Sequence, residues 1–592
     1  MSHADERLSA AAAAAGDGSA DLVLSGGAYV EVYTGHILHG DVAISGTRIA
    51  AVGEIDHCLG PTTEVVDCSG LILLPGLIEP HIHIGGSQLT IERLAEVLVP
   101  RGTAAICTDF YEPGVISGRV AIEELISRSE GTGLDILLSP FHATALGFGA
   151  FGNTDRFGLE DLVHLAEHQS AVAIREWNLA SSRIPLAEIR RFYEVALERR
   201  LAVEGHLEGL TGPALQASVA LGVMTDHETG TAEQAIEMAR LGITVQIREG
   251  SGSRDMATVV RAITEKGGDP RNFSLATDEQ ELHSLSRDGH MDYKLRLAVA
   301  HGVPPIEAVR MATLTAAEGL GVARDYGSIA PGRIASIAAV RDLRDFAVEL
   351  VVSRGRLSAR QGEYLLETQR VAYPTEWYET VHVDRRLGAT DFAFDPSLDQ
   401  ARVRIIGITP GSLVTEELVE AVQFNAGLPD RTTGLATLAV IDRHEGGSRQ
   451  GLGLLRGFDL AAGAVATTIN PGLMNLMVLG VNEDDMAAAA NRVVELQGGI
   501  VVVKDGRVRA EVSTPVFGIL SDKPSAEVIE SCRAVADAIA ADLRVGFDGL
   551  ITSVGFACLA VIIPALKLCD RGLVRITREG GQEAVDLVVD GG

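Results

Sequence analysis

The sequence predicts an α/β protein with a (β/α)8 barrel, a small β-domain formed by segments before and after the barrel, and a C-terminal α/β domain. Three observations support this fold class. Residues 75–324 alternate eight apolar, strand-like runs with helical patterns, as repeated βα units do. Residues 21–74 and 325–372 carry short strand patterns with glycine-rich turns. Residues 373–592 return to a separate pattern of strands and helices.

Residues 1–20 are expected to form a flexible tail, because they lack the basic segment and leucine-rich core of a signal peptide. The runs DLVLSGGAYVEVYTG and DVAISGTRIAAVGE then alternate apolar and polar residues with period two, which indicates short strands. After the barrel, DYGSIAPGRIASIAAVRDL shows the same chemistry. We therefore expect both chain ends of the barrel to join one small β-domain.

Within the barrel region, each strand-like run is followed by a helical pattern. The eight predicted strands are LILLPGLIEPHIHI, TAAICTDFYE, LDILLSPFHA, AVAIREWN, LAVEGHLEG, GVMTDHETG, ITVQIREGS and FSLATDEQE. The predicted helices include residues 90–99, 158–168, 186–199 and 232–241, with 483–496 and 525–542 in the C-terminal domain. The uncharged run 551–566 is shorter than the ~20 residues that span a bilayer, so we expect it to be a core segment.

The amino-acid composition limits the classes of binding partner and indicates a cellular compartment. Acidic residues outnumber basic ones by 80 to 50, and the net charge of −30 repels nucleic acid and anionic membranes. Aromatic residues, at 4%, are too few for base-stacking platforms. The six cysteines form no CxxC motif, which favours reduced thiols and a cytoplasmic protein. We expect a homo-oligomer, namely a dimer, that acts on a small molecule.

Imidazole and carboxylate groups stand at the predicted carboxyl ends of several strands, where barrel enzymes place their active sites. One histidine at a strand end is more often structural than a ligand. A set this dense is hard to explain by structure alone, and its chemistry suits Zn, Mn or Fe. The predicted metal ligands are His81, His83, Glu176, His206, His227 and Asp278.

The motif PGLIEPHIHI resembles the opening motif of the amidohydrolase superfamily. More narrowly, GHLEGLTGPAL, TDHETGTAEQA and ATDE followed by GHMDYKLRLA are similar to the adenine deaminase family. FGILSDKPSAEV and IIPALKLCDRGL are similar to the C-terminal domain of that family. The resemblance covers nearly the whole chain after the first residues, and it implies a metal-dependent hydrolase of purine metabolism.

By this resemblance, each chain would hold two divalent metal ions, with Mn or Fe expected first and Zn as the other candidate. His81, His83 and Asp278 would bind one ion, His206 and His227 would bind the second, and Glu176 would bridge them. A metal-bridging hydroxide would attack a carbon bearing nitrogen and release ammonia, converting adenine to hypoxanthine or a related aminopurine. Asp278 and Glu176 are the predicted catalytic residues, with Asp278 passing the proton to the leaving nitrogen.

Three positions depart from the family pattern. Gly85 stands where the family has Glu, Tyr111 stands where it has His, and residues 467–475 lack the family's HDSHN motif. These changes predict a pocket that is roomier at Gly85 and has fewer ionisable contacts, which favours a bulkier or less polar substrate than adenine. The candidate substrate contacts are Gly85, Asp109, Tyr111, His142, Arg248, Glu249 and Ser251.

Three functions remain open from the sequence. The first is an aminohydrolase acting on adenine or a close relative. The second is a dinuclear-metal amidohydrolase acting on a different heterocyclic amine, a cyclic amide or another small amide. The third is a non-catalytic relative, which the retention of all six ligand residues disfavours. Release of ammonia separates the first two.

Overall fold

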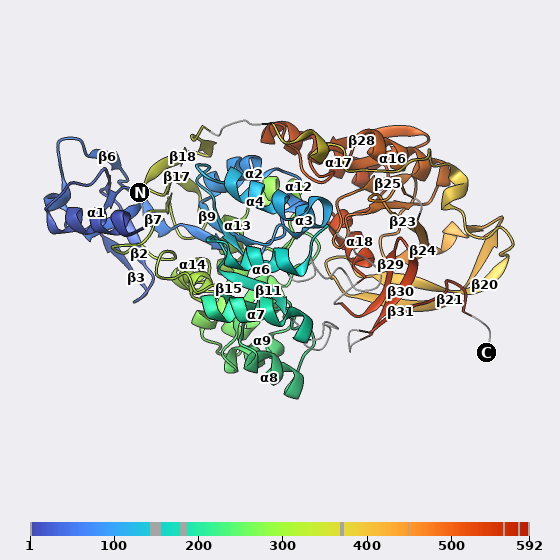
Figure 1. Ribbon diagram of the computed structural model, residues 1–592, viewed down its shortest axis with the longest axis horizontal. Helices are drawn as coiled ribbons and strands as arrows, with labels where there is room; N and C mark the ends of the chain where they lie inside the picture. The colour runs from blue at the N-terminus through green and yellow to red at the C-terminus, as the bar shows by residue number, and fades with distance from the viewer. Residues whose placement is uncertain are drawn as a thin grey trace.

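The computed structural model describes residues 3–141, 156–177, 186–367, 372–447, 449–560, 563–577 and 581–589 of the 592-residue chain. Three regions follow one another along the longest axis of the molecule (Figure 1). The N-terminal β-structure is blue, the strand–helix repeat lies in the middle, and the C-terminal region is yellow to red.

The middle region has a TIM-barrel-like α/β fold. Its described strands are β8 (Leu77–Glu79), β9 (Thr103–Thr108), β10 (Asp135–Leu138), β11 (Ala173–Trp177), β12 (Ala202–Gly205), β13 (Val223–Asp226), β14 (Thr244–Arg248) and β15 (Phe273–Ala276). They form two parallel sheets, β10-β9-β8 and β11-β12-β13-β14-β15. Isolated parallel bridges, Leu138↔Ala171 and Ile82↔Asp278, lie where the two sheets meet. All eight predicted strands therefore occur in the described part of the chain, and β8 begins after Gly76.

Helices follow these strands and pack apolar stripes against them. In α9 (Ala232–Arg240) the buried residues recur at Ala232, Ala235 and Met238, as the helical period requires. The helices predicted from the sequence are found to within two residues, and α7 has the predicted bounds. The described helices of this region are α2 (Ile91–Leu98), α3 (Tyr111–Ser117), α4 (Arg119–Arg128), α6 (Leu159–Glu167), α7 (Leu186–Arg199), α8 (Gly212–Ala220), α9, α10 (Met256–Val259), α11 (Arg261–Thr264), α12 (Leu282–Asp288), α13 (Met291–Ala300), α14 (Pro305–Met311) and α15 (Leu314–Gly319).

Strands from both sides of the repeat share one sheet. Strand β16, after the barrel, pairs antiparallel with β7, before it, from Ile337↔Pro75 to Val340↔Ile72. The seven-stranded sheet has the order β19-β18-β17-β16-β7-β2-β3, and a four-stranded sheet has the order β5-β4-β1-β6. Their bounds are β1 (Leu22–Ser25), β2 (Ala28–Glu31), β3 (His36–His39), β4 (Asp41–Ser45), β5 (Arg48–Gly53), β6 (Glu64–Asp67), β7 (Ile72–Pro75), β16 (Ile337–Val340), β17 (Val348–Ser353), β18 (Arg356–Arg360) and β19 (Glu363–Tyr364). The domain boundaries themselves stay predictions.

The N-terminal segment is a helix, α1 (His3–Ala15), and the flexible tail predicted for residues 1–20 is wrong there. Alanine is the best helix former, and its small side chain lets a helix approach a sheet closely. Ala13 is buried against β5, and Arg7 Nη2 lies 2.8 Å from Asp325 Oδ1. Packing and an ion pair therefore hold this segment on the β-structure.

The C-terminal region contains a nine-stranded mixed sheet with the order β22-β21-β20-β24-β23-β26-β25-β27-β28 and a small sheet, β29-β30-β31. Helix α18, which begins the uncharged run 551–566, is buried along its whole length, as a core segment should be. The elements are β20 (Gln400–Ile408), β21 (Thr415–Asn425), β22 (Leu428–Pro429), β23 (Ala436–Ile441), β24 (Gln450–Arg456), β25 (Ala464–Thr467), β26 (Leu476–Gly480), α16 (Glu483–Glu495), β27 (Gly499–Lys504), β28 (Arg507–Ser513), α17 (Ser525–Ala541), α18 (Leu550–Cys558), β29 (Ala565–Cys569), β30 (Gly572–Ile576) and β31 (Gln582–Ala584).

The C-terminal region docks onto the loop that follows β8. The Ser521 N–H donates to Gln88 O at 2.8 Å, and the Thr90 N–H donates to Ser521 O at 3.1 Å. Arg93 Nε donates to Asp522 O at 3.0 Å. The C-terminal region lies beside the middle region (Figure 1), and its residues share a cavity wall with residues at the carboxyl ends of the central strands. Among the described residues, no helix combines the length and hydrophobicity needed to cross a membrane.

The packing of α1 predicts a position-specific effect of enlarging its alanines. Ala13→Leu should destabilise the N-terminal β-structure by about 1–3 kcal/mol, because overfilling a tight contact forces neighbours apart. Ala11→Leu, on the exposed side of the same helix, is the matched control. Thermal unfolding and limited proteolysis of the N-terminal segment measure the difference. Equal behaviour of the two variants would contradict the packed helix.

Candidate metal centre

The six predicted ligand residues lie together at the carboxyl ends of five central strands, and all of them are buried. Their imidazole and carboxylate atoms fall into three overlapping groups, and within each group the atoms lie within 4.8 Å of one another. The groups are His81, His227 and Asp278; His81, His83 and Glu176; and Glu176, His206 and His227. The fold therefore brings together the residues that sequence spacing alone leaves far apart.

Glu176 is the carboxylate that faces all four histidines. Its Oε1 lies 3.3 Å from His81 Nε2 and 3.8 Å from His83 Nε2. The same oxygen lies 3.7 Å from His227 Nε2, while Oε2 lies 3.2 Å from His206 Nδ1. One oxygen thus reaches the histidines of β8 and β13, and the other reaches the histidine after β12. This is the position that a bridging carboxylate needs.

Asp278 divides its two oxygens between different partners. Oδ1 lies 3.7 Å from His83 Nε2 and 3.9 Å from His81 Nε2. Oδ2 lies 3.2 Å from Arg248 Nη1. The guanidinium therefore holds one oxygen in place while the other faces the imidazoles.

The backbones of Glu176 and Asp278 are both left-handed, with φ of 67° and 65°. A residue other than glycine pays about 1–3 kcal/mol for such a conformation and keeps it only when its surroundings enforce it. At Asp278 the enforcing contacts are backbone bonds. Its N–H donates to His81 O at 2.9 Å, and its O accepts from the His83 N–H at 2.8 Å. The strain therefore lies at the two residues that carry the central carboxylates.

Glu204 is a buried carboxylate beside the histidines that the sequence interpretation missed. Its Oε2 lies 3.3 Å from His81 Nδ1, and its Oε1 accepts a 2.6 Å hydrogen bond from Ser139 Oγ. Arg175 Nη2 lies 3.8 Å from the same Oε1. Such a partner orients an imidazole and sets which ring nitrogen is free. The available signal was period two, because Glu204 precedes His206 by two residues on one strand.

Glu79 ties the ends of two strands together and was also missed. Its Oε1 accepts hydrogen bonds from the His81 N–H at 3.0 Å and the Thr277 N–H at 3.1 Å. Its Oε2 accepts from Thr277 Oγ1. The fully buried carboxylate therefore fixes β8 against β15 next to His81 and Asp278.

Asp109 and the surrounding protein give the two histidines after β8 opposite protonation tendencies. Burial and the neighbouring His227 hold the pKa of His81 well below its usual value. Burial also opposes protonation of His83, but the Asp109 carboxylate, 3.2 Å from Nδ1, raises the pKa of His83 to about 10. A cation at His83 Nε2 would compete with that proton.

The donor atoms fit divalent cations. His81 Nε2, Glu176 Oε1 and His227 Nδ1 are buried and make no hydrogen bond to any described group. Leaving such atoms unpaired costs about 1–3 kcal/mol each. Imidazole nitrogens with carboxylate oxygens are the donor set of Zn, Mn and Fe sites. The cluster therefore has the chemistry of a metal centre that uses divalent ions.

A cavity opens beside this cluster, and the C-terminal region forms part of its wall. The wall joins ligand residues such as His83 and Asp278 to apolar residues of the C-terminal region, including Leu413, Phe556 and Leu559. The apolar side restricts access of water to the ionisable groups.

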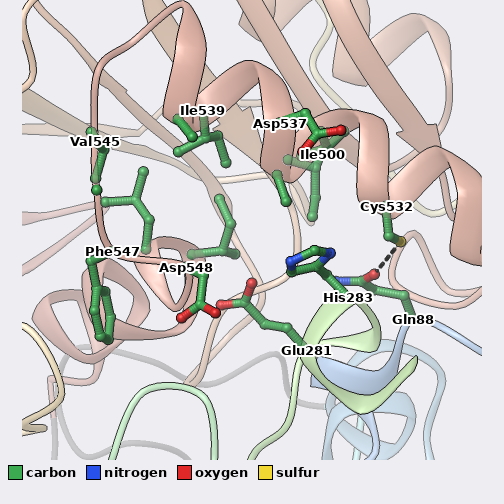
Figure 2. A pocket seen from close by; sticks show the side chains of 16 residues that line it. Gln88, Glu281, His283, Ile500, Cys532, Asp537, Ile539, Val545, Phe547 and Asp548 are labelled. Atoms are coloured by element: carbon green, nitrogen blue, oxygen red, sulfur yellow. Dashed lines mark hydrogen bonds between the residues drawn. The ribbon is translucent and has the colours of Figure 1, made fainter. Parts of the chain in front are cut away.

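Two further cavities continue along the contact between the barrel and the C-terminal region. The first, beside the metal cluster, is lined by Gly85, Glu112 and Asn470 among others. Figure 2 shows the second, in which Gln88 and Glu281 from the barrel face residues of the C-terminal region. Gln88 and Glu281 line both cavities, so the two are neighbours.

Two of the predicted substrate contacts lie in these cavities. Tyr111 lines the cavity at the metal cluster and the one beside it, and Gly85 lines the latter. A Cβ at Gly85 would lie 2.8 Å from Glu112 Oε1, and the roomier pocket expected at Gly85 stays a prediction. A carboxylate fills the space that a side chain would take. His142 lies outside the described residues.

The other predicted substrate contacts lie within the protein and outside the described lining of these cavities. Asp109 holds His83, and Arg248 contacts Asp278. Glu249 Oε2 accepts from the Met256 N–H at 3.2 Å, and Ser251 Oγ accepts from the Glu281 N–H at 2.9 Å. These side chains hold the loops that carry the site.

Two segments of the chain match known protein families. Residues 72–358 match the amidohydrolase family, and residues 412–579 match the adenine deaminase C-terminal domain. An adenine deaminase from Paracoccus denitrificans is 33% identical, covering 97% of this chain and 96% of that protein. One from Nitratidesulfovibrio vulgaris is 36% identical, covering 95% and 96%. A crystal structure of a zinc-bound adenosine deaminase from Xanthomonas campestris is 16% identical, with a TM-score of 0.43, covering 59% and 94%.

The contact between Glu204 and His81 predicts a loss of metal affinity when the carboxylate is removed. Glu204→Gln should weaken binding of a divalent metal by roughly 10- to 100-fold, because outer carboxylates orient the ligand imidazole and raise its basicity. Competition with a fluorescent chelator measures the change. Glu194→Gln, on the exposed face of α7, removes the same charge far from the cluster and should change nothing. Equal affinities in both variants would contradict the orienting role.

Proposed function

The chain belongs to the adenine deaminase family of the amidohydrolase superfamily, and on this premise we propose that it deaminates adenine or a closely related aminopurine. It is a metal-dependent hydrolase acting on a C–N bond other than a peptide bond. The observation that carries the proposal is the placement of Glu176 within reach of all four buried histidines. A carboxylate in this position could bridge two metal ions of a hydrolytic centre.

In this proposal two divalent ions, Mn or Fe first and Zn as the other candidate, occupy the cluster. By the family resemblance, His81, His83 and Asp278 would hold one ion and His206 and His227 the other, with Glu176 available to both. When bound, such ions lower the pKa of water and supply a nucleophile near neutral pH. Which of Mn, Fe or Zn occupies the site depends on the availability of each metal and on the coordination geometry that the ligands allow.

The protein's own part in the reaction is proton transfer and exclusion of water. Water adds to the carbon that bears the amino group, the C–N bond breaks, and ammonia leaves with the transferred protons. Asp278 Oδ1 faces the cluster and is placed to accept a proton and return it to the leaving nitrogen, while Arg248 holds Oδ2. Phe556 and Leu559 contribute apolar wall to the cavity beside the cluster.

Finer features of the fold and setting belong to the same proposal. The bridges Leu138↔Ala171 and Ile82↔Asp278 support closure of the strands into a (β/α)8 barrel. All six cysteines are buried and free, which supports a cytoplasmic location. The expected homodimer stays a prediction.

A different substrate class is the second candidate. Gly85, Tyr111 and Asn470, which mark the departures from the family pattern, all line the cavity beside the metal cluster. The three departures therefore change the side chains along one wall of the cavity near the substrate. This change favours another heterocyclic amine, a cyclic amide or another small amide as the substrate. Ammonia release from aminopurines, measured against ring opening of cyclic amides, separates the two candidates. A non-catalytic role is disfavoured because the whole ligand set is assembled.

We expect metal-reconstituted protein to hold two divalent ions per chain, because the cluster offers two sets of ligand atoms that share Glu176. Elemental analysis of the purified, folded protein measures the number. His227→Ala should remove at least one equivalent, and His301→Ala, on a helix end outside the cluster, should remove none. Well under one equivalent in the folded wild type would contradict the centre.

Asp278→Asn should lower kcat by roughly 10²–10⁴ while much of the metal stays bound, because an amide oxygen still binds a cation but the amide is no general base. The measurement is the rate of ammonia release, with metal content determined on the same samples. Asp269→Asn, which removes an exposed carboxylate before β15, is the control. A near-normal kcat for Asp278→Asn on the true substrate would remove Asp278 from the mechanism.

A further inference from the structure

We propose that the cavity beside the metal cluster is a substrate subsite that binds an N–H-bearing substituent, with the Glu112 carboxylate as the acceptor. The inference rests on the proposed function and narrows its substrate class. The substrate would be an aminopurine or similar heterocycle that carries an amino or other N–H group in addition to the one that reacts.

The cavity is continuous with the metal site. Tyr111, Glu279 and Pro471 line both this cavity and the one that contains the proposed metal ligands. A heterocycle bound at the metals can therefore extend a substituent past Tyr111 toward Glu112. The cavity of Figure 2 adjoins this one, because Gln88 and Glu281 line both.

Glu112 provides an unpaired acceptor in this wall. The side chain is buried, with 3% of the residue exposed. Its Oε1 accepts a 2.9 Å hydrogen bond from the Gly85 N–H, while its Oε2 makes no hydrogen bond to a described group. Burial raises the pKa of Glu112 to about 7, and the Asp109 carboxylate adds to the effect. A donor from a ligand would relieve the cost of this unpaired carboxyl group.

Three neighbouring polar side chains of the wall are already engaged. Asn470 Nδ2 donates to Asn475 O at 2.7 Å, and the Tyr111 hydroxyl accepts from the Gly472 N–H at 3.4 Å. Thr552 Oγ1 donates to Glu281 at 2.8 Å. Glu112 Oε2, in contrast, is buried and makes no hydrogen bond to a described group, and a carboxylate selects donors such as N–H over carbonyl oxygens or methyl groups.

Glycine at position 85 is what allows this arrangement. A Cβ there would lie 2.8 Å from Glu112 Oε1 and 3.3 Å from its carboxyl carbon, so any larger residue would push the carboxylate away. With glycine at position 85, the Glu112 carboxylate, at the start of α3, can lie against the backbone of residue 85 and accept its N–H.

The test compares near-isosteric adenine pairs that carry an amino or a methyl group on the same ring carbon, position 2 or position 8. For wild-type enzyme, kcat/KM should favour the amino member of at least one pair by roughly 10- to 100-fold, the value of one hydrogen bond to a charged acceptor. In Glu112→Gln, the amide oxygen can keep the bond to Gly85 and place NH2 where Oε2 was. The preference should then fall to about one or reverse.

A second pair of variants tests the role of glycine. Gly85→Ala should reduce the amino preference, because its Cβ displaces the Glu112 carboxylate. Gly388→Ala should retain the preference, because Gly388 is exposed, is absent from the lining of this cavity, and would place its Cβ within 4 Å of no other atom. A wild-type ratio near one for both ring positions, or an unchanged ratio in Glu112→Gln, would overturn the subsite.

The two proposals fail in distinguishable ways. If no purine is turned over, the proposed function fails, and calorimetric Kd values for the same pairs with metal-loaded protein decide on the subsite. If adenine is turned over but the amino and methyl analogues behave alike, the subsite fails and the proposed function stands. Absence of any amino preference in both turnover and binding counts against the subsite.

Discussion

Buried charge at the strand ends is the constraint on which the surrounding structure depends. Four imidazoles and two carboxylates lie where water cannot solvate them, and their facing atoms make few hydrogen bonds with one another. Burying these ionisable groups costs free energy unless bound cations and a fixed outer ring of hydrogen-bond and ion-pair partners offset the cost. Glu204, Arg175 and Arg248 form that ring. The strained backbones of Glu176 and Asp278 persist for the same reason, since every neighbour is itself held in place.

The same constraint explains why a second region covers the strand ends. If the metal centre were open to solvent, its ligands would exchange with water. Water would also weaken the electrostatic interactions between its charged groups. Phe556 and Leu559 from the C-terminal region form the apolar part of the cavity wall, and the Ser521–Gln88 backbone bond fixes that region to the loop after β8. The chemistry therefore comes from the central strands, and the enclosure comes from a separate part of the chain.

Much of the architecture and the ligand set was predictable, because a strand has period two and barrel strands direct their ends to one mouth. These rules identify His81 and His83 directly. Applied further, they would also have found Glu79 and Glu204, each two residues before a histidine. The role proposed for Glu112 could not be predicted from the sequence, because it depends on a tertiary contact between α3 and Gly85, in the turn after β8. The helix α1 was missed for another reason: an alanine run carries no amphipathic pattern, and tertiary packing decides its state.

Positions that differ from a family pattern are usually counted one at a time, as groups lost or gained. The contact between Gly85 and Glu112 shows why this counting misleads in a closed pocket. Space is shared there, and the glycine leaves room for the Glu112 carboxylate against the backbone of residue 85. A pocket that has lost one glutamate can therefore keep an acidic wall through a carboxylate that another element supplies. In the proposed subsite this carboxylate acts on substrate choice, while the candidate metal ligands lie on separate strands.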